Sequence, residues 1–184
     1  MSRFTPTLHP AAVVLCVSLC LALPGAALAA DPTTEAREAV AAFQKSDPGL
    51  DRFFRSSAGY AVFPSVVKGG FGAGGAGGSG VVFERGEPVG KTSLAQETFG
   101  LRLGGQAYSE IIFFENAAAL SDFKKGNFAL ATQVNAVALS AGVSANARYQ
   151  SGVAVFTLTK TRPMYEASVG GQKFSYQRLE SRGS

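Results

Sequence analysis

The chain has 184 residues, with 17 basic and 13 acidic side chains and a formal net charge of +4. It contains no tryptophan, and its one histidine and two cysteines (His9, Cys16 and Cys20) lie in an N-terminal segment that we predict to be removed. The remaining chain would then lack the side chains for a Cys or His zinc site, for Ser-His-Asp or Cys-His catalysis, and for a disulfide. We predict no metal and no cofactor.

The N-terminal segment has the features of a secretory signal peptide in their usual order. Arg3 precedes an uncharged apolar stretch over residues 11–23, and an Ala-Leu-Ala tripeptide ending at Ala29 supplies small residues at positions −3 and −1. The apolar stretch is too short to span a bilayer comfortably. We predict residues 1–29 to be the signal peptide, with cleavage after Ala29 or alternatively Ala30, and a periplasmic or secreted protein. Removing Arg3 lowers the net charge to +3.

Two helices are predicted at the start of the mature chain. Asp31-Pro32 and Asp47-Pro48 each offer an N-cap followed by proline at the first helical position. The second helix should end near Gly59, and Arg52 and Arg55 flank its phenylalanines. Such a helix either lies on a membrane surface or packs on the sheet of its own domain, and we favour packing. The apolar stripe of the first helix is Ala36, Ala39, Val40 and Phe43, and that of the second is Leu50, Phe53 and Phe54.

A glycine-rich stretch, KGGFGAGGAGGSG, occupies residues 68–80 and is followed by the strand-like Val81–Phe83. Pro64 is expected to stop a short strand just before it. The abutting β-branched residues argue against a flexible linker. We predict ordered backbone in a β-rich domain, with a bend where a chain segment or a ligand passes closely.

The remainder of the chain is predicted to be mainly short strands. Residues 99–103 alternate with a period of two, and residues 108–114 include an unbroken apolar run that is typical of a strand buried on both faces. Asn116 is expected to cap a short helix, with Leu120 and Phe123 inward, that ends near Gly126. A turn is expected at residues 86–90 and further strands at 134–139, 143–149, 153–158 and 165–169.

These elements predict one α+β domain over residues 30–184, with a frayed C-terminal tail. Its sheet should be curved and mostly antiparallel, because the strands follow one another without intervening helices. N-terminal helices and one short central helix complete the expected fold.

Enzymatic motifs are weak in this sequence. Gly72, Gly74 and Gly77 match G-x-G-x-x-G, but a strand follows instead of a helix, and residues 86–92 are one residue short of a P-loop. No spacing pairs two acids on one element, so a solvated surface is expected for each of Glu97, Glu110, Glu115 and Glu166. We predict that the protein is not an enzyme, and no module for nucleic acid is evident.

Several segments together resemble the SYLF lipid-binding domain family. They are residues 58–64 (AGYAVFP), 68–72 (KGGFG), 77–81 (GGSGV) and 157–160 (TLTK), followed by Met164-Tyr165 and Gly170-Gly171. The resemblance covers about residues 35–178. Within the family, the chain is similar to an exported bacterial branch. Members bind anionic phospholipids, and eukaryotic members bind phosphoinositides. The resemblance implies a non-catalytic protein that docks reversibly on anionic phospholipid, with phosphoinositide-like head groups, as a peripheral membrane protein.

The resemblance also implies candidate head-group contacts, since glycine amides and a lysine can converge on a phosphate. Charge and position add three arginines to them. The candidate lipid-binding residues are Lys68, Gly69, Gly70, Lys160, Arg162, Arg52 and Arg55. The alternative function is a structural or protein-interaction module of the bacterial cell envelope, without lipid specificity and with an envelope protein as partner.

Overall fold

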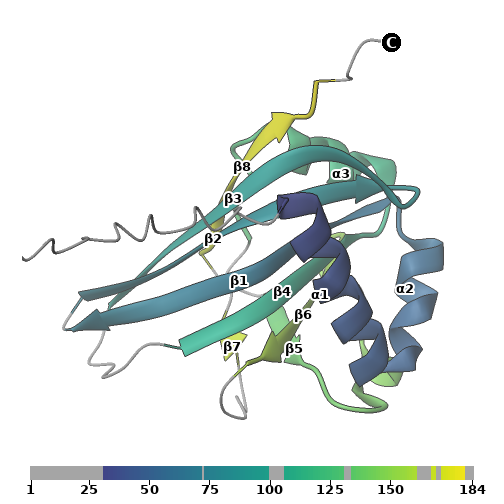
Figure 1. Ribbon diagram of the computed structural model, residues 1–184, viewed down its shortest axis with the longest axis horizontal. Coiled ribbons are helices and arrows are strands. Elements are labelled where there is room, and N and C mark those ends of the chain that lie inside the picture. The colour runs from purple at the N-terminus through teal and green to yellow at the C-terminus, as the bar shows by residue number, and fades with distance from the viewer. Residues whose placement is uncertain are drawn as a thin grey trace, which may run out of the picture.

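The computed structural model describes residues 31–71, 73–99, 106–130, 134–160, 167–168 and 171–180. These residues form a single α+β domain in which helices cover an open sheet (Figure 1). The predicted fold class is therefore confirmed. The predicted signal peptide and residues 181–184 of the tail lie outside the described residues, as does Arg162.

The sheet has the strand order β7-β5-β6-β4-β1-β2-β3-β8. Neighbouring strands among the described residues are antiparallel, except for β5 and β6, which are parallel. This confirms the mostly antiparallel sheet. The strands are β1 (Gly59–Phe71), β2 (Ala73–Glu84), β3 (Glu87–Phe99), β4 (Gln106–Phe114), β5 (Asn135–Ala138), β6 (Val153–Thr159), β7 (Ala167–Ser168) and β8 (Lys173–Arg178).

The N-terminal helices pack on one face of this sheet (Figure 1). Helix α1 (Pro32–Ser46) begins at the predicted cap, where the Asp31 carboxylate accepts a hydrogen bond of 3.3 Å from the Thr33 N–H. A 3₁₀ turn, η1 (Pro48–Leu50), leads into α2 (Asp51–Ser56). The ring of Phe53 lies 5.4 Å from that of Phe113 and 5.0 Å from that of Phe156. The second helix therefore packs on its own sheet, as favoured from the sequence.

Helix α3 (Ala117–Lys124) covers the opposite face of the sheet, and a separate core lies beneath it. The Asn116 side chain caps α3 by accepting a 3.0 Å hydrogen bond from the Ala119 N–H, as predicted. Strand β4 supplies both cores by alternation. Ile112 and Phe114 pack under α3, Ile111 and Phe113 pack under α1, and all four are fully buried.

Strand β1 does not stop at Pro64, which corrects the sequence prediction. The pairing register of β1 shifts between Val62 and Ser65, so that a bulge carries the chain past the proline. Proline has no N–H to donate to a neighbouring strand, and a bulge removes the need for one. The Pro64 carbonyl accepts a 2.7 Å hydrogen bond from the Ser109 hydroxyl, which holds the bulge against β4.

The glycine-rich stretch is regular strand rather than the predicted bend. Its residues 73–80 belong to β2, which pairs with β1 on one side and β3 on the other. The expected close approach is present at Gly80, where a Cβ would lie 2.7 Å from Cδ1 of Phe63 and closer still to the Val62 carbonyl oxygen. The glycines therefore let β1 and the Phe63 ring press directly on the backbone of β2.

Replacing Gly80 with alanine is expected to lower the free energy of unfolding by about 2 kcal/mol, because the added methyl group overpacks this contact. Gly69 is the matched control, since a Cβ there would meet no atom within 4 Å. Gly69→Ala should change stability by less than about 0.5 kcal/mol. Urea denaturation of the mature chain measures both. Equal stability of the two variants would show that the Gly80 contact is not tight.

Three further differences from the sequence prediction concern the remaining chain. The turn before β3 is a two-residue hairpin at Arg85-Gly86, with φ of 53° and 82°, rather than residues 86–90. Residues 143–146 form a 3₁₀ turn, η2 (Val143–Asn146), where a strand was expected, because the buried Asp47 carboxylate accepts the Ser144 N–H at 2.8 Å. Strand β8 was missed. Of the strand predicted at 99–103, residues 100–103 lie outside the described residues.

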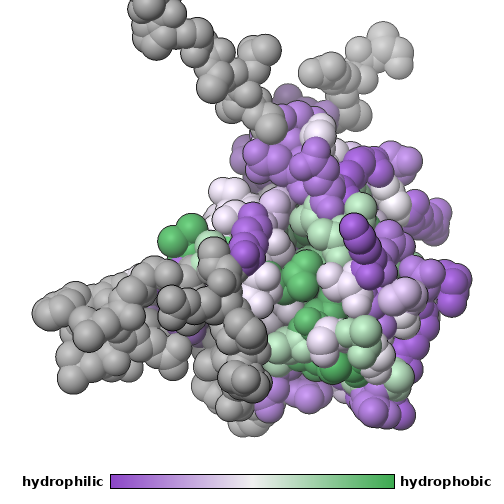
Figure 2. Space-filling model, turned by 60° about the horizontal axis from the view of Figure 1, so that its bottom comes forward, coloured by the Kyte–Doolittle hydropathy of each residue, from purple (hydrophilic) through white to green (hydrophobic). Residues whose placement is uncertain are grey.

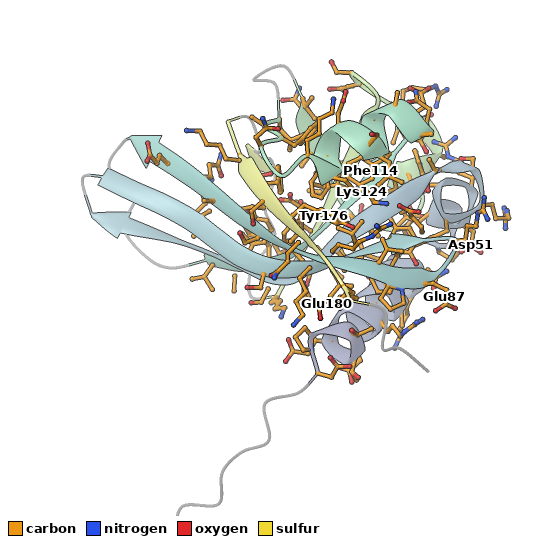
Figure 3. All side chains as sticks on the ribbon, turned by 90° about the horizontal axis from the view of Figure 1, so that it is seen from above. Asp51, Glu87, Phe114, Lys124, Tyr176 and Glu180 are labelled. Atoms are coloured by element: carbon orange, nitrogen blue, oxygen red, sulfur yellow. The ribbon has the colours of Figure 1, made fainter. Side chains whose placement is uncertain are left out.

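Strands β1, β2 and β3 run past their neighbours and form a projecting arm (Figures 1 and 3). Among the described residues, the last residue of β1 that pairs with β4 is Lys68, and the last residue of β3 that pairs with β8 is Ala95. Beyond these points the three strands pair with one another. We define the projecting arm as these residues together with the last paired residues at its base, that is, residues 67–71, 73–77 and 95–99.

Candidate functional site

The structure places Lys68, Gly69 and Gly70 in sequence along β1, at the base of the projecting arm. The side chain of Lys68 is 7% exposed and shares a face of the sheet with Val66 and Ala76, inside the core under α3. Lys160 follows the last residue of β6 and is exposed, and its N–H donates to the Ala107 carbonyl oxygen at 3.2 Å. The two predicted lysines thus lie at the same end of the sheet.

Lys68 and Lys160 nevertheless belong to opposite faces of the sheet. Phe156 packs under α1, so strand alternation assigns Lys160 to that face, whereas Lys68 follows the alternation of Val66 under α3. The bulge at Pro64 is the reason. Before it, the odd residues Ala61 and Phe63 face α3, and after it the even residue Val66 does. If the strand alternated regularly through residue 64, with no bulge, Lys68 would share the face of Lys160.

The two predicted arginines of α2 lie at the opposite end of β1. Lys68 is separated from the start of β1 by nine residues, which span about 30 Å in a strand. The Arg52 guanidinium donates to the carbonyl oxygens of Ser144 at 2.5 Å and Ala147 at 2.7 Å, so it fastens η2 to α2. Arg55 is exposed on the same helix. The structure therefore does not gather the described candidate residues into one site.

A row of backbone-paired residues crosses the exposed face of the sheet at the base of the arm. Val67 pairs with Gly77 and Ala107, and Ala95 pairs with Gly77 and Lys173. Val67 is 58% exposed, which is unusual for a large apolar side chain within a sheet. The exposed Lys160 and Lys173 stand at the two ends. We call this the exposed row: Lys160, Ala107, Val67, Gly77, Ala95 and Lys173.

Two further rows of paired residues lie on either side of the exposed row. On the side toward the helices, exposed serines follow one another across four strands, and the Ser93 and Ser175 hydroxyls lie 2.6 Å apart. At the tip, Ala73 pairs with Phe71 on one side and with Phe99 on the other. The exposed Glu97, opposite Gly75, lies between the exposed row and the tip. The arm thus consists largely of glycine and alanine positions, with Val67 as its exposed apolar side chain.

On the opposite face of the sheet, beside the base of the arm, polar side chains are buried together. We call this the buried polar cluster: Lys68, Tyr108, Glu110, Thr157 and Gln172. The Gln172 side-chain amide donates to Oε2 of Glu110 at 3.1 Å and lies 3.5 Å from the Tyr108 hydroxyl. Gln172 immediately precedes β8, so the sheet curves enough for this contact to cross three intervening strands.

Burial raises the pKa of Glu110 to about 7, although the hydrogen bond from Gln172 and the positive charge of Lys68 each lower it. Glu110 is fully buried, which corrects the expectation of a solvated surface for this acid. Burial also raises the pKa of Tyr108, and the nearby Glu110 charge adds to that increase. The cluster therefore holds a carboxyl group that changes charge near neutral pH.

The sequence did contain a signal for this cluster. Tyr108 and Glu110 lie in the strand that the sequence predicts to be buried on both faces, and they share a face with Ile112. An acid inside such a strand should have been expected to be buried. Its partners Lys68 and Gln172 could not be identified from local sequence, because long-range pairing and the bulge bring them together.

A shallow cavity of about 270 Å³ lies between β5, β6 and η2. Val137, Ala154 and Phe156 contribute apolar surface to it, and Arg148 and Gln150 contribute polar groups. Figure 2 shows hydrophobic residues gathered at the centre of one face of the molecule, with hydrophilic residues around them. The Arg148 guanidinium already donates to the Ala147 carbonyl oxygen at 3.0 Å, so it makes a hydrogen bond within its own loop.

Comparison with known proteins adds no family assignment. No protein-family model matches the chain, and no curated protein matches it. Among the described residues, no helix is long and apolar enough to cross a membrane, and no group of three or more His, Cys, Asp or Glu side chains could hold a metal ion. The resemblance to the SYLF family stays a prediction.

Proposed function

We propose that this is an exported, non-catalytic protein that docks reversibly on anionic phospholipid, including phosphoinositide-like head groups, through the projecting arm. The observation that carries the proposal is the exposed row. Val67 lies on β1, one of the three strands that extend beyond the rest of the sheet, and an exposed lysine lies at each end of the row, one directly after β6 and one on β8. The predicted signal peptide supports a periplasmic or secreted location at a membrane surface. The resemblance to lipid-binding domains supports the same ligand.

The chemistry of the arm suits a membrane interface. Lys160 and Lys173 each contribute about 1 kcal/mol of attraction near an anionic surface. Val67 provides an apolar group for the head-group region, and the glycines let lipid approach the backbone closely. Glu97 opposes part of the attraction. Binding should therefore be weak, and salt should weaken it further.

Co-sedimentation with vesicles tests this function. The mature chain is expected to sediment with vesicles of phosphatidylglycerol and phosphatidylcholine at about 50 mM salt and to be released at about 500 mM, where charges are screened within about 4 Å. Vesicles of phosphatidylcholine alone should leave it in the supernatant. A protein that stays in the supernatant with every vesicle would refute lipid docking, and an envelope protein partner would become the favoured alternative.

A further inference from the structure

The loop that walls the cavity between β5, β6 and η2 is held to the N-terminal helices at its first end. The buried Asp47 carboxylate accepts a 2.8 Å hydrogen bond from the Ser144 N–H. The Arg52 guanidinium donates to the carbonyl oxygens of Ser144 and Ala147. These three hydrogen bonds join residues that are 92 to 97 positions apart in the sequence, so the fold itself sets the position of the loop.

The same loop is held at its second end, where it turns into β6. Gln150 and Val153 exchange two backbone hydrogen bonds, of 2.7 and 3.1 Å, across a turn at residues 151–152, which both have positive φ. The Gln150 side chain also reaches β5, where its Oε1 accepts the Asn135 N–H at 3.3 Å. Because the loop is held at both ends, the cavity is formed before any ligand arrives, and little ordering opposes binding.

The floor of the cavity is apolar. Ala154 and Phe156 belong to the core under α1 and are 4% and 0% exposed, and the half-buried Val137 packs against the same core. A volume of about 270 Å³ holds roughly nine non-hydrogen atoms, if each takes about the 30 Å³ that a water molecule occupies in the liquid. The size and the lining suit a short hydrocarbon chain.

The rim of the cavity is positively charged. Arg148 uses its Nη1 for the carbonyl oxygens of Ala145 and Ala147, at 3.4 and 3.0 Å. Its Nη2 and Nε, and the side-chain amide nitrogens of Gln150 and Asn146, make no hydrogen bond with the described residues. None of the described residues that line the cavity is acidic. A guanidinium with N–H groups to spare matches the two oxygens and the single charge of a carboxylate.

We propose that this cavity binds a small amphiphilic carboxylate, that is, an alkyl chain of medium length with one carboxylate group. The carboxylate accepts hydrogen bonds from the Arg148 guanidinium and the Gln150 amide, and the alkyl chain covers Val137 and Phe156. The cavity lies along the first residues of β6, whereas Lys160 and the projecting arm lie beyond its last residue. The site is therefore separate from the arm and does not depend on the proposed lipid docking.

Titration with sodium octanoate, followed by the amide NMR chemical shifts of the isotope-labelled mature chain at neutral pH and constant ionic strength, tests the site. A shallow cavity for about nine atoms predicts a dissociation constant on the order of 1 mM. The shifts should saturate and be largest at residues 135–137 and 146–150. Octylammonium, with the same chain and the opposite charge, should bind at least about tenfold more weakly. Acetate, which lacks the chain, should give no saturating shifts.

Two variants test the charge and the chain separately. Arg148→Gln removes the charge at an exposed position, and Val137→Phe places a ring in the cavity. Each should weaken octanoate binding at least about tenfold. The control Arg178→Gln makes the same charge change at an exposed position of β8 and should bind octanoate as the wild type does. Unchanged binding in either cavity variant, shifts that do not saturate, or shifts that map to the projecting arm would overturn the site.

Discussion

At about pH 8, the Glu110→Gln variant is expected to have a free energy of unfolding about 3 kcal/mol higher than that of the wild type. Burial raises the pKa of Glu110 from 4.5 to about 7, so the folded state holds a proton that the unfolded state has already lost between these two values. Stability must therefore fall as the pH rises through this window, and then level off above it. The glutamine side chain is neutral at every pH, so the Glu110→Gln variant does not lose stability in this window.

The measurement is urea denaturation of both proteins at several pH values between about 4 and 8. The difference in free energy of unfolding should be small at the acid end and grow toward the alkaline end. Glu115→Gln is the matched control, because Glu115 directly follows β4 but is exposed. Its difference from the wild type should stay near zero throughout. A gap for Glu110→Gln that does not change with pH would show that this carboxyl titrates normally.

The helices of this fold were predictable because their signals are local. Asp31 and Asn116 cap α1 and α3 as their side chains and spacing indicate. The apolar run of β4 identified a strand buried on both faces for a similar reason, since burial follows directly from composition there. These features depend on interactions between residues close in sequence, which is the information that one sequence contains.

The glycine-rich stretch and Pro64 were misjudged because their structure depends on neighbours far away in sequence. Glycine and proline are both poor strand formers by themselves. In β2 the pairing with β1 and β3 outweighs this preference, and Gly80 is required by the Phe63 ring above it. In β1 the bulge accommodates Pro64, and the Ser109 hydroxyl takes its carbonyl oxygen. No local pattern reports these contacts.

The candidate site shows the same limit. The sequence identified Lys68 and Lys160 as candidate lipid-binding residues, and the structure places both at the arm end of the sheet. A single extra residue at the bulge turns Lys68 inward beside Glu110, so the predicted shared surface is lost. The second lysine of the exposed row is Lys173, and it lies on a strand, β8, that the sequence did not predict.

Charge reversal at the two ends of the exposed row should have the largest effect on docking. The double variant Lys160→Glu and Lys173→Glu changes the charge by four units at the face that we propose to meet the membrane, and each lysine contributes about 1 kcal/mol there. We expect its affinity for phosphatidylglycerol vesicles to fall at least about thirtyfold, since every 1.4 kcal/mol is about tenfold. Both side chains are exposed, so the fold should be kept.

Co-sedimentation of this double variant with anionic vesicles at low salt tests the central claim most directly. The control is Lys45→Glu combined with Lys125→Glu, which makes the same change in net charge at exposed positions of α1 and the end of α3. The account predicts that the arm variant stays in the supernatant while the control still sediments with the vesicles. Equal binding of the two variants would contradict docking through the projecting arm.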